Sequence, residues 1–400
     1  MRLLLAGFGA LVAVLVSASP AWAHGGDAPD GTDYRTVVTA VSPAPAGLRV
    51  RAVEAGARLE LTNRTGTTVE VLGYQNEPYL EVRPDGVYEN VHSPAVYLNA
   101  TLTGTANLPA TADPTLPPTW RRTSGEPVAL WHDHRSHWML STPPPSVTAD
   151  PSRVQRIRDW VVPLRTGGVT PLEVHGTLDW VPPPSAGVWW AWSLVAALGV
   201  AVLGVVGRLR RLAGLLTVRS AASSPGAASA ASAASGSRGW VPVALAAVSG
   251  VGGVAAVVYA VGREIDAGND GFGAVLGGLF AGQIWPVLTG LAALAAGAYA
   301  LLRRPAADFA LALAGVCVAV FAGVSNAGAF GNGVVPVPWS PVLGRLLLAV
   351  VIAAGAGVAG AAALRMRATA GRPPVPGPRR DPDRPAHDGA AETPAVESGA

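Results

Sequence analysis

The 400-residue chain has one cysteine, no lysine and only 14% charged residues. A single cysteine excludes an intrachain disulfide and every metal site built from several thiolates. All 29 basic side chains are therefore arginines, and the net charge is only +3. Arginine clusters lie beside the apolar runs and in the C-terminal tail, and with so small a net charge this pattern argues against a nucleic-acid partner. The missing lysine and scarce isoleucine favour a GC-rich, actinobacterial source.

Half of the residues are hydrophobic, which indicates a membrane protein. Long apolar runs begin only after about residue 187, whereas residues 34–182 contain short alternating segments. The sequence therefore predicts an exported all-β domain followed by an α-helical membrane domain with five spans.

Residues 1–23 have the pattern of a secretory signal peptide. Arg2 supplies the positive start, residues 3–16 form a short apolar run, and residues 21–23 form an A-x-A cleavage site. The alternative is an uncleaved membrane helix, but the run is shorter than the roughly 20 residues that span a bilayer. Cleavage after Ala23 would make His24 the mature N-terminus, with an amine and an imidazole available to one metal ion. A histidine left there by chance is the plainer interpretation.

The segment 24–182 is predicted to be an extracytoplasmic β-sandwich of immunoglobulin-like or cupredoxin-like form. Turn-forming stretches at 43–47, 54–56, 63–66 and 83–86 separate its alternating segments. The predicted strands are 35–41, 48–53, 58–61, 68–72, 79–82, 87–90, 158–162 and 172–180. The Pro-, Thr- and Ala-rich stretch 100–127 is expected to be a long irregular loop.

The membrane domain is predicted to begin after three prolines with a spanning helix at 187–207. A flexible cytoplasmic linker follows at 208–239, then a four-helix membrane region at 240–367 and a disordered cytoplasmic tail at 368–400. The four further spans lie near 240–262, 276–302, 306–328 and 343–364. The third span of the chain, 276–302, is longer than necessary, so its first part is expected to be tilted, interfacial or re-entrant.

Arginine positions predict the orientation of this domain in the plasma membrane. Arginines cluster at 208–211, 238, 303–304 and 365–371, and the loops 263–272 and 329–341 are expected to lie on the other side. The positive-inside rule then places the β domain outside the cell and the tail in the cytoplasm. The lipid bilayer is the predicted partner, together with an envelope or membrane protein that docks on the β domain or the helices.

The stretch Trp131-His132-Asp133-His134-Arg135-Ser136-His137-Trp138-Met139 holds three of the seven histidines. Imidazole with thioether and no thiolate suits copper better than zinc. On an extended strand His132 and His134 share one face, and His137 and Met139 join them only if a turn falls at Arg135-Ser136. The predicted metal ligands are His132, His134, His137, Met139 and His24, with copper as the ion. The alternative is that the imidazoles bond to neighbouring groups and brace a polar surface.

Several activities lack support in the sequence. It has no G-x-S-x-G, S-x-x-K or P-loop motif, so an enzyme is the less favoured hypothesis. No chain of histidines or carboxylates crosses the predicted spans, as proton-coupled transport normally requires. The Gly- and Ala-rich spans instead favour close helix packing in a bundle or a partner-docking platform.

The motifs together resemble those of a group of actinobacterial exported, multi-span membrane proteins with no established activity. They are the Ala-Trp-Ala-His signal end, Gly73-Tyr74 with Glu77-Pro78-Tyr79, the Trp131–Arg135 phrase and the Trp180-Val181-Pro182-Pro183-Pro184 phrase. This resemblance covers residues 20–190 best.

A more distant likeness is to exported copper-handling proteins of the CopC and YcnI types. Their mature chains also begin with histidine, which copper proteins use as a histidine brace, and they form β-sandwiches. This chain departs from them in its length, its 100–127 loop and its spans. Copper importers of the CopD type carry histidines or methionines in their helices, and the spans here have none. Copper binding or delivery at the cell envelope is therefore the predicted function, and a metal-free envelope interaction module is the alternative.

Overall fold

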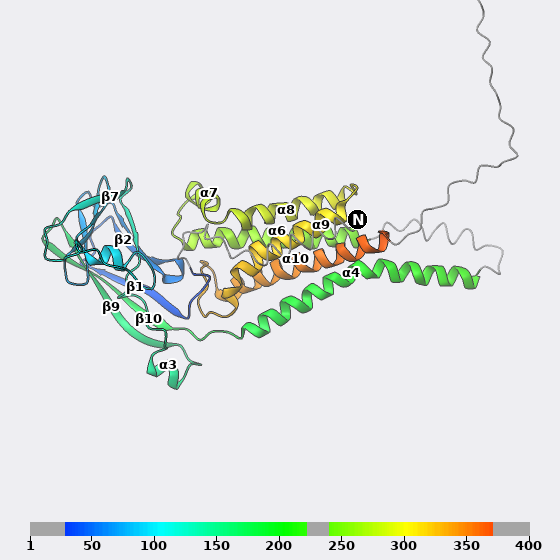
Figure 1. The fold of residues 1–400 in the computed structure, drawn as a ribbon, viewed down its shortest axis with the longest axis horizontal. Coiled ribbons are helices and arrows are strands. Elements are labelled where there is room, and N and C mark those ends of the chain that lie inside the picture. Colours follow the sequence, from blue (N-terminus) through cyan, green and yellow to red (C-terminus); the bar gives the residue numbers. More distant parts are fainter. Residues whose placement is uncertain (1–28, 222–239, 371–400) are drawn as a thin grey trace, which may run out of the picture.

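The computed structural model describes residues 29–221 and 240–370, which form a β domain at one end of a helical bundle (Figure 1). The predicted signal peptide, His24, the linker residues 222–239 and the tail beyond 370 lie outside the described residues.

The larger sheet of the β domain has seven antiparallel strands in the order β1-β10-β9-β4-β5-β6-β7. The first and last strands of the domain therefore pair with each other, from Tyr34 opposite Trp180 to Ser42 opposite Glu173, with a bulge between Val38 and Ala40. The strands are β1 (Tyr34–Ser42), β4 (Val69–Leu72), β5 (Pro78–Arg83), β6 (Gly86–Asn90), β7 (Trp120–Ser124), β9 (Gln155–Thr166) and β10 (Thr170–Trp180).

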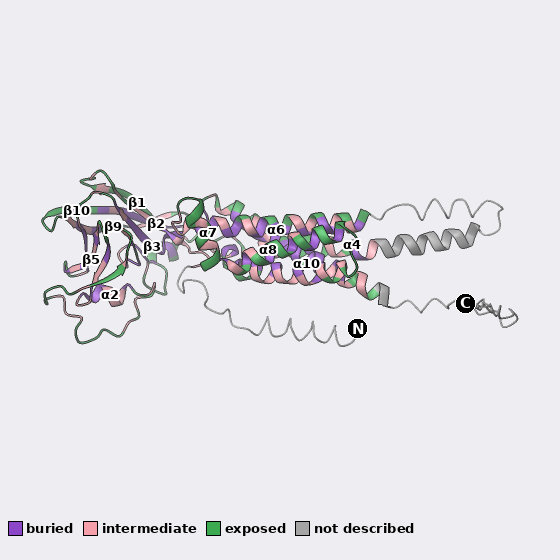
Figure 2. Ribbon diagram, turned by 90° about the horizontal axis from the view of Figure 1, so that it is seen from above, coloured by how far each residue is buried: buried purple, intermediate pink, exposed green. Residues whose placement is uncertain are grey.

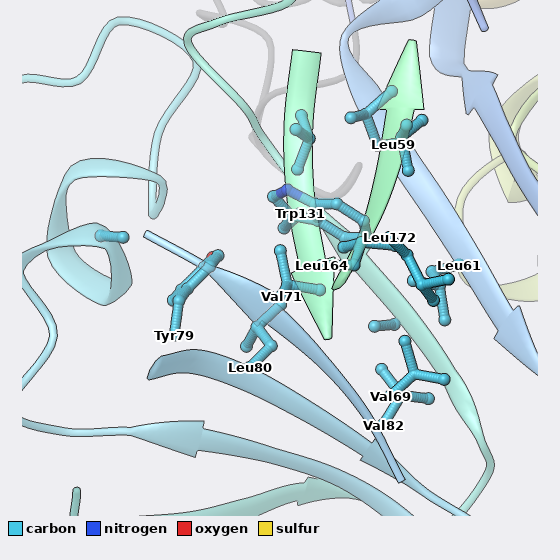
Figure 3. Packing of buried hydrophobic residues seen from close by; sticks show 14 of the residues in the cluster. Leu59, Leu61, Val69, Val71, Tyr79, Leu80, Val82, Trp131, Leu164 and Leu172 are labelled. Atoms are coloured by element: carbon cyan, nitrogen blue, oxygen red, sulfur yellow. The ribbon is translucent and has the colours of Figure 1, made fainter. Parts of the chain in front are cut away.

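A second, three-stranded antiparallel sheet has the order β2-β3-β8. It consists of β2 (Leu48–Val53), β3 (Arg58–Asn63) and β8 (Val128–Trp131). One apolar cluster joins residues of both sheets, with Leu59 and Leu61 from the small sheet and Val71, Leu164 and Leu172 from the large one (Figure 3). Burial of these side chains on one side of each strand explains the alternating sequence pattern.

The predicted strands coincide with eight of the observed ones, but β7 and β8 add two more. The expectation of an irregular loop over 100–127 is therefore wrong for Trp120–Ser124, which pairs with β6 at the sheet edge. An edge strand buries little apolar surface, and β7 is mostly polar, so it lacks the alternating signal. Two short helices, α2 (Pro94–Leu98) and α3 (Pro145–Ala149), also interrupt the strands.

Within the described residues, five helical segments are long and apolar enough to cross a membrane. They are Ala186–Val206 in α4 (Ala186–Ala221), α6 (Trp240–Asp266), α8 (Ile284–Leu301), Ala307–Phe330, and Pro341–Arg367 in α10 (Pro341–Ala370). The fourth segment is α9 (Ala307–Val318) continued by a π turn η2 (Ala319–Gly323) and the 3₁₀ segment η3 (Val324–Phe330). The chain thus has the layout of a multi-pass membrane protein.

Two helical boundaries differ from the predicted ones. Helix α4 continues to Ala221, so residues 208–221 of the predicted flexible linker are helical, as their leucines, alanines and arginines favour. The long predicted span 276–302 is divided into α8 and a separate short helix, α7 (Phe272–Ala281), with Gly282 between them. Helix α7 lies at the end of the bundle next to the β domain (Figure 2).

The β domain is bonded to this end of the bundle through its N-terminal segment. Thr32 and Val334 exchange two backbone hydrogen bonds of 3.1 and 2.7 Å. The Asp33 carboxylate accepts a hydrogen bond from the Gly333 amide at 2.7 Å. Close by, Arg263 of α6 pairs with Asp30 at 2.7 Å. These contacts tie the start of the β domain to the end of α6 and to the loop that contains Gly333 and Val334.

A second set of bonds joins the β2–β3 corner to the end of α6. The Arg51 guanidinium donates to the Gly268 carbonyl at 2.6 Å, and the Ala55 amide donates to the Asp266 carboxylate at 2.7 Å. Glu54 and Ala55 have positive φ angles of 56° and 55° in this corner. Such a conformation is costly for residues other than glycine, and the bond to Asp266 helps to hold it.

Candidate functional site

The histidine-rich motif begins where β8 ends, at Trp131, and then turns rather than continuing as a strand. The Asp133 carbonyl accepts hydrogen bonds from the Ser136 amide at 2.9 Å and from its hydroxyl at 2.7 Å. The Asp133 carboxylate also accepts from the Arg135 amide at 3.1 Å, as expected for aspartate at the first position of a turn. The turn includes Arg135-Ser136, the position that the sequence argument required for His137 to approach His132.

A buried ion pair fixes this turn. Both oxygens of the fully buried Asp133 carboxylate accept from the Arg135 guanidinium at 2.8 Å, and the Trp131 indole donates to the same carboxylate at 3.0 Å. Arg135 reaches on to the Leu72 carbonyl at 3.1 Å and lies 5.0 Å from the Tyr74 ring centre. Asp133 and Arg135 of the motif therefore stabilise the fold of the β domain.

The turn places His132 and His137 beside each other, with ring centres 6.5 Å apart. His132 is buried, and its Nδ1 lies 2.7 Å from the Ala57 carbonyl, so Nδ1 carries the proton in the neutral ring. Its Nε2 accepts a long hydrogen bond of 3.4 Å from Arg58. A metal-ligating histidine commonly donates its other ring nitrogen to a backbone carbonyl in this way.

His134 points to a different neighbourhood from His132 and His137. Its ring stacks on Tyr74 with centres 6.0 Å apart, and its Nε2 lies 3.3 Å from the Thr101 carbonyl. Met139, the last residue of the motif, is exposed. The structure therefore pairs His132 with His137, a spacing of five residues that an alternating strand pattern does not predict.

His137 carries the most unusual group of the motif. The side chain is only 8% exposed, and its Nε2 has no hydrogen-bond partner among the described residues. Burial, with a smaller contribution from neighbouring His132, lowers the pKa of this imidazole to about 4. His137 also lines a cavity of about 140 Å³ together with Pro29 and Gly31 from the start of the chain. The imidazole is thus neutral near pH 7 and borders an open space.

The low pKa of His137 predicts how stability depends on pH. Because the folded pKa of about 4 is below the ordinary value of 6.5, the unfolded chain binds more protons between these values. The free energy of unfolding should therefore fall as the pH is lowered from about 6.5 to 4, by roughly 2–3 kcal/mol in total. His137→Gln should flatten this slope in denaturant titrations followed by tryptophan fluorescence.

A matched control is His92→Gln, because His92 makes its Nδ1 contact with the Pro117 carbonyl at the surface. This variant should keep the pH slope of the parent protein. An unchanged slope in His137→Gln would mean that the buried imidazole does not set the pH dependence.

Other polar residues with little exposure lie at the junction of the β domain and the helical bundle, and the sequence did not predict a site there. Glu264 and Arg263 lie in the last turn of α6, two residues or less beyond the predicted end of the span at 262. Arg345 lies near the start of α10 and is buried. The sequence does show charged residues at the ends of these apolar runs. It does not show that they are buried against the β domain, because that burial depends on contacts between distant parts of the chain.

No group of three or more histidine, cysteine, aspartate or glutamate side chains converges to hold a metal ion within 29–221 and 240–370. His24 lies outside the residues that the structure describes. Comparison with protein families, with curated proteins and with solved structures finds no match to this chain. Functional inference therefore depends on the geometry around His132 and His137 and on the junction between the β domain and the helices.

Proposed function

We propose that this protein is a membrane-anchored extracytoplasmic protein that binds or delivers copper at the cell envelope. His132 and His137 would hold the ion, with His24 as a further ligand. The single observation that carries the proposal is the buried Nε2 of His137, which lacks a hydrogen-bond partner in the described part of the chain and borders a cavity beside His132.

The spacing of the two rings is compatible with one shared ion. An imidazole nitrogen binds a metal at about 2.0 Å, so two rings on one ion have centres at most roughly 6.5 Å apart, in a linear arrangement. The observed separation is 6.5 Å, with the ring planes tilted by 60°. A small movement of either ring, with release of the 3.4 Å contact between His132 and Arg58, would allow both nitrogens to bind.

The start of the chain can supply the third ligand. Pro29 lines the cavity beside His137 and lies five positions after His24 in the chain. An extended chain of that length reaches up to about 17 Å. The predicted cleavage after Ala23 would free an amine and an imidazole within this range.

The donor set favours copper over harder ions. Imidazole and amine nitrogens bind copper more strongly than other divalent first-row metals, whereas calcium and magnesium require oxygen ligands. His134 and Met139, which the sequence grouped with this site, are proposed to be auxiliary: His134 as a brace against Tyr74, and Met139 as an exposed thioether near the end of the motif.

The proposal includes the orientation of the chain. The β domain, of immunoglobulin-like or cupredoxin-like form, would be exported by the signal peptide, and the tail would lie in the cytoplasm, as the arginine clusters predict. A protease-cleavable tag at residue 395 should be accessible only from the cytoplasm; extracellular cleavage would contradict this topology.

The test uses full-length protein, processed after Ala23 and purified in detergent, with Cu(I) and Cu(II) titrated against a competing chelator. Replacing both His132 and His137 by alanine should lower copper affinity by about 100-fold or more, since two ligands are lost. One alanine inserted before His24 should weaken binding if the N-terminal amine is a ligand. His175→Ala, on β10, is the matched control and should bind as the parent does.

The alternative is a metal-free envelope interaction module. The observation that favours it is the bonding of the motif, in which Asp133 and Arg135 serve the fold. Under this hypothesis the histidine variants lower thermal stability, and copper changes neither the parent nor the variants. Copper binding that survives the loss of both His132 and His137 would also contradict the proposed site.

A further inference from the structure

A larger cavity, of about 480 Å³, lies between the β domain and the helical bundle. Glu54, Glu60 and Leu130 line it from the β domain, and Glu264 and Gln283 line it from the bundle. Small-molecule sites have volumes of roughly 300–1,000 Å³, so this space suits an organic molecule rather than a single ion. It contains none of the histidines of the proposed copper site.

Two carboxylates of this cavity already face arginines. Glu60 lies 2.8 Å from Arg51, and Glu54 lies 3.3 Å from Arg58. Their charges are therefore balanced within the β domain, and neither needs a ligand.

Glu264 is different. It is 6% exposed and accepts hydrogen bonds from the Asn269 amide, at 2.7 Å, and from Gln283. Within the described residues it forms no ion pair, although Arg263 lines the same cavity and acts on it at longer range. The neighbouring Arg263 instead donates to Asp30 and Asn326, each at 2.7 Å. A buried carboxylate without a cation is costly, so the cavity has a place for one positive charge.

Two glycines keep the Glu264 carboxylate at the cavity wall. A Cβ atom at Gly278 of α7 would lie 1.9 Å from one carboxylate oxygen, and one at Gly282 would lie 3.2 Å from the other. Both glycines line the cavity, so no side chain comes between them and the carboxylate. The amides of Asn269 and Gln283 add neutral hydrogen-bonding groups on the same wall.

Helix α7 gives this wall an apolar outer side. Phe272, Leu276 and Phe280 are spaced four residues apart and are exposed, Phe272 by 84%. The helix has no charged residue and connects the ends of α6 and α8, two candidate spans. With α6 and α8 spanning a membrane, this exposed apolar helix would lie beside the lipid, and the cavity would border the lipid as well as the water phase.

We infer that this cavity binds an organic primary ammonium group. The ammonium donates to Glu264, and the apolar part of the ligand lies along Leu130 and Ala281. Glu54 and Glu60 are already paired with arginines, so Glu264 is the one carboxylate of the three that is left for a ligand, and hard divalent ions require several oxygen ligands. Two sources offer this chemistry: the headgroup of an ethanolamine lipid, reached past α7, and a free amine in water.

The experiment uses the full-length protein in phosphatidylglycerol nanodiscs and follows thermal unfolding during titration with phenethylamine. The amine should raise the melting temperature, and the neutral analogue 2-phenylethanol should not. Glu264→Gln should lower the amine affinity by about tenfold or more, because it removes a charge-assisted hydrogen bond. Asp159→Asn, at a carboxylate that is 77% exposed on β9, is the matched control and should bind normally.

Ala281→Leu provides an independent variant that fills the cavity without changing its charge, and it should also weaken binding of the amine.

Nanodiscs with added phosphatidylethanolamine identify the source of the ammonium group. If these nanodiscs stabilise the protein and suppress the response to phenethylamine, the lipid headgroup is the ligand. An undiminished response to phenethylamine instead assigns a water-borne amine. The inference is overturned if neither amine nor ethanolamine lipid stabilises the protein, if 2-phenylethanol acts equally, or if Glu264→Gln responds as the parent does. His137→Ala should leave the amine response intact, which separates this site from the copper proposal.

Discussion

Replacing Arg135 by alanine should destabilise the β domain by about 3–5 kcal/mol, the usual cost of leaving one partner of a buried ion pair without the other. Asp133 is fully buried, and both of its carboxylate oxygens accept from Arg135 at 2.8 Å. The same guanidinium bonds the Leu72 carbonyl at 3.1 Å, so the variant also detaches the turn from β4. Urea or guanidinium unfolding followed by tryptophan fluorescence measures the change, since Trp131 donates to Asp133.

Arg153→Ala is the matched control for this prediction. Arg153 forms an ion pair with Asp150 at 2.5 Å, but the arginine side chain is 74% exposed. Exposed pairs contribute about 0–1 kcal/mol, so this variant should unfold close to the parent. Equal losses in the two variants would show that burial of Asp133 has no special energetic consequence.

Arg345→Ala should have the second large effect, a loss of about 3 kcal/mol or more in the stability of the full-length protein. The buried Arg345 guanidinium donates to the carbonyls of Ala329, Asn332 and Gly333 at 2.9, 2.6 and 3.0 Å. Each carbonyl left unpaired in a buried setting costs about 1–3 kcal/mol. The melting temperature in detergent should fall, and limited proteolysis should cut sooner between residues 329 and 334.

The control is Arg365→Ala in the same helix. Arg365 pairs with Asp308 at 2.8 Å, and both side chains are partly exposed. It should cause a smaller loss and leave the proteolysis of the 329–334 loop unchanged. If the two variants were indistinguishable in proteolysis, Arg345 would not be the residue that fixes this loop.

The strands and spans were largely predictable because each has a periodic or continuous apolar signal. Strands such as β9 alternate buried and less buried residues, and α6 and α10 are apolar over many turns. Strand β7 lacks this signal because it is polar and lies at a sheet edge. Helix α7 was only partly predicted, since its apolar residues are continuous with those of the next span and only Gly282 marks the break.

The candidate sites were less predictable for a physical reason. The sequence contains the cluster of histidines, but the pairing of His132 with His137 depends on a turn that Asp133 and Arg135 close. Glu264 forms no ion pair among the described residues because its neighbour Arg263 bonds to Asp30, and this arrangement depends on how two separately patterned regions pack against each other. The contacts around Glu264 join residues far apart in the chain, and no local sequence pattern specifies them. Copper as the ion stays a prediction.

The two sets of bonds between the β domain and the bundle have an entropic consequence. A β domain attached only through Pro182–Pro184 would rotate and tilt relative to the helical bundle. A ligand that contacts both the domain and the bundle would then lose binding free energy by restricting that motion. Here the bonds to Asp266, Gly333 and Val334 have removed this freedom during folding. A ligand at the junction would therefore meet a preorganised surface, and its affinity would not be reduced by the cost of orienting the domain.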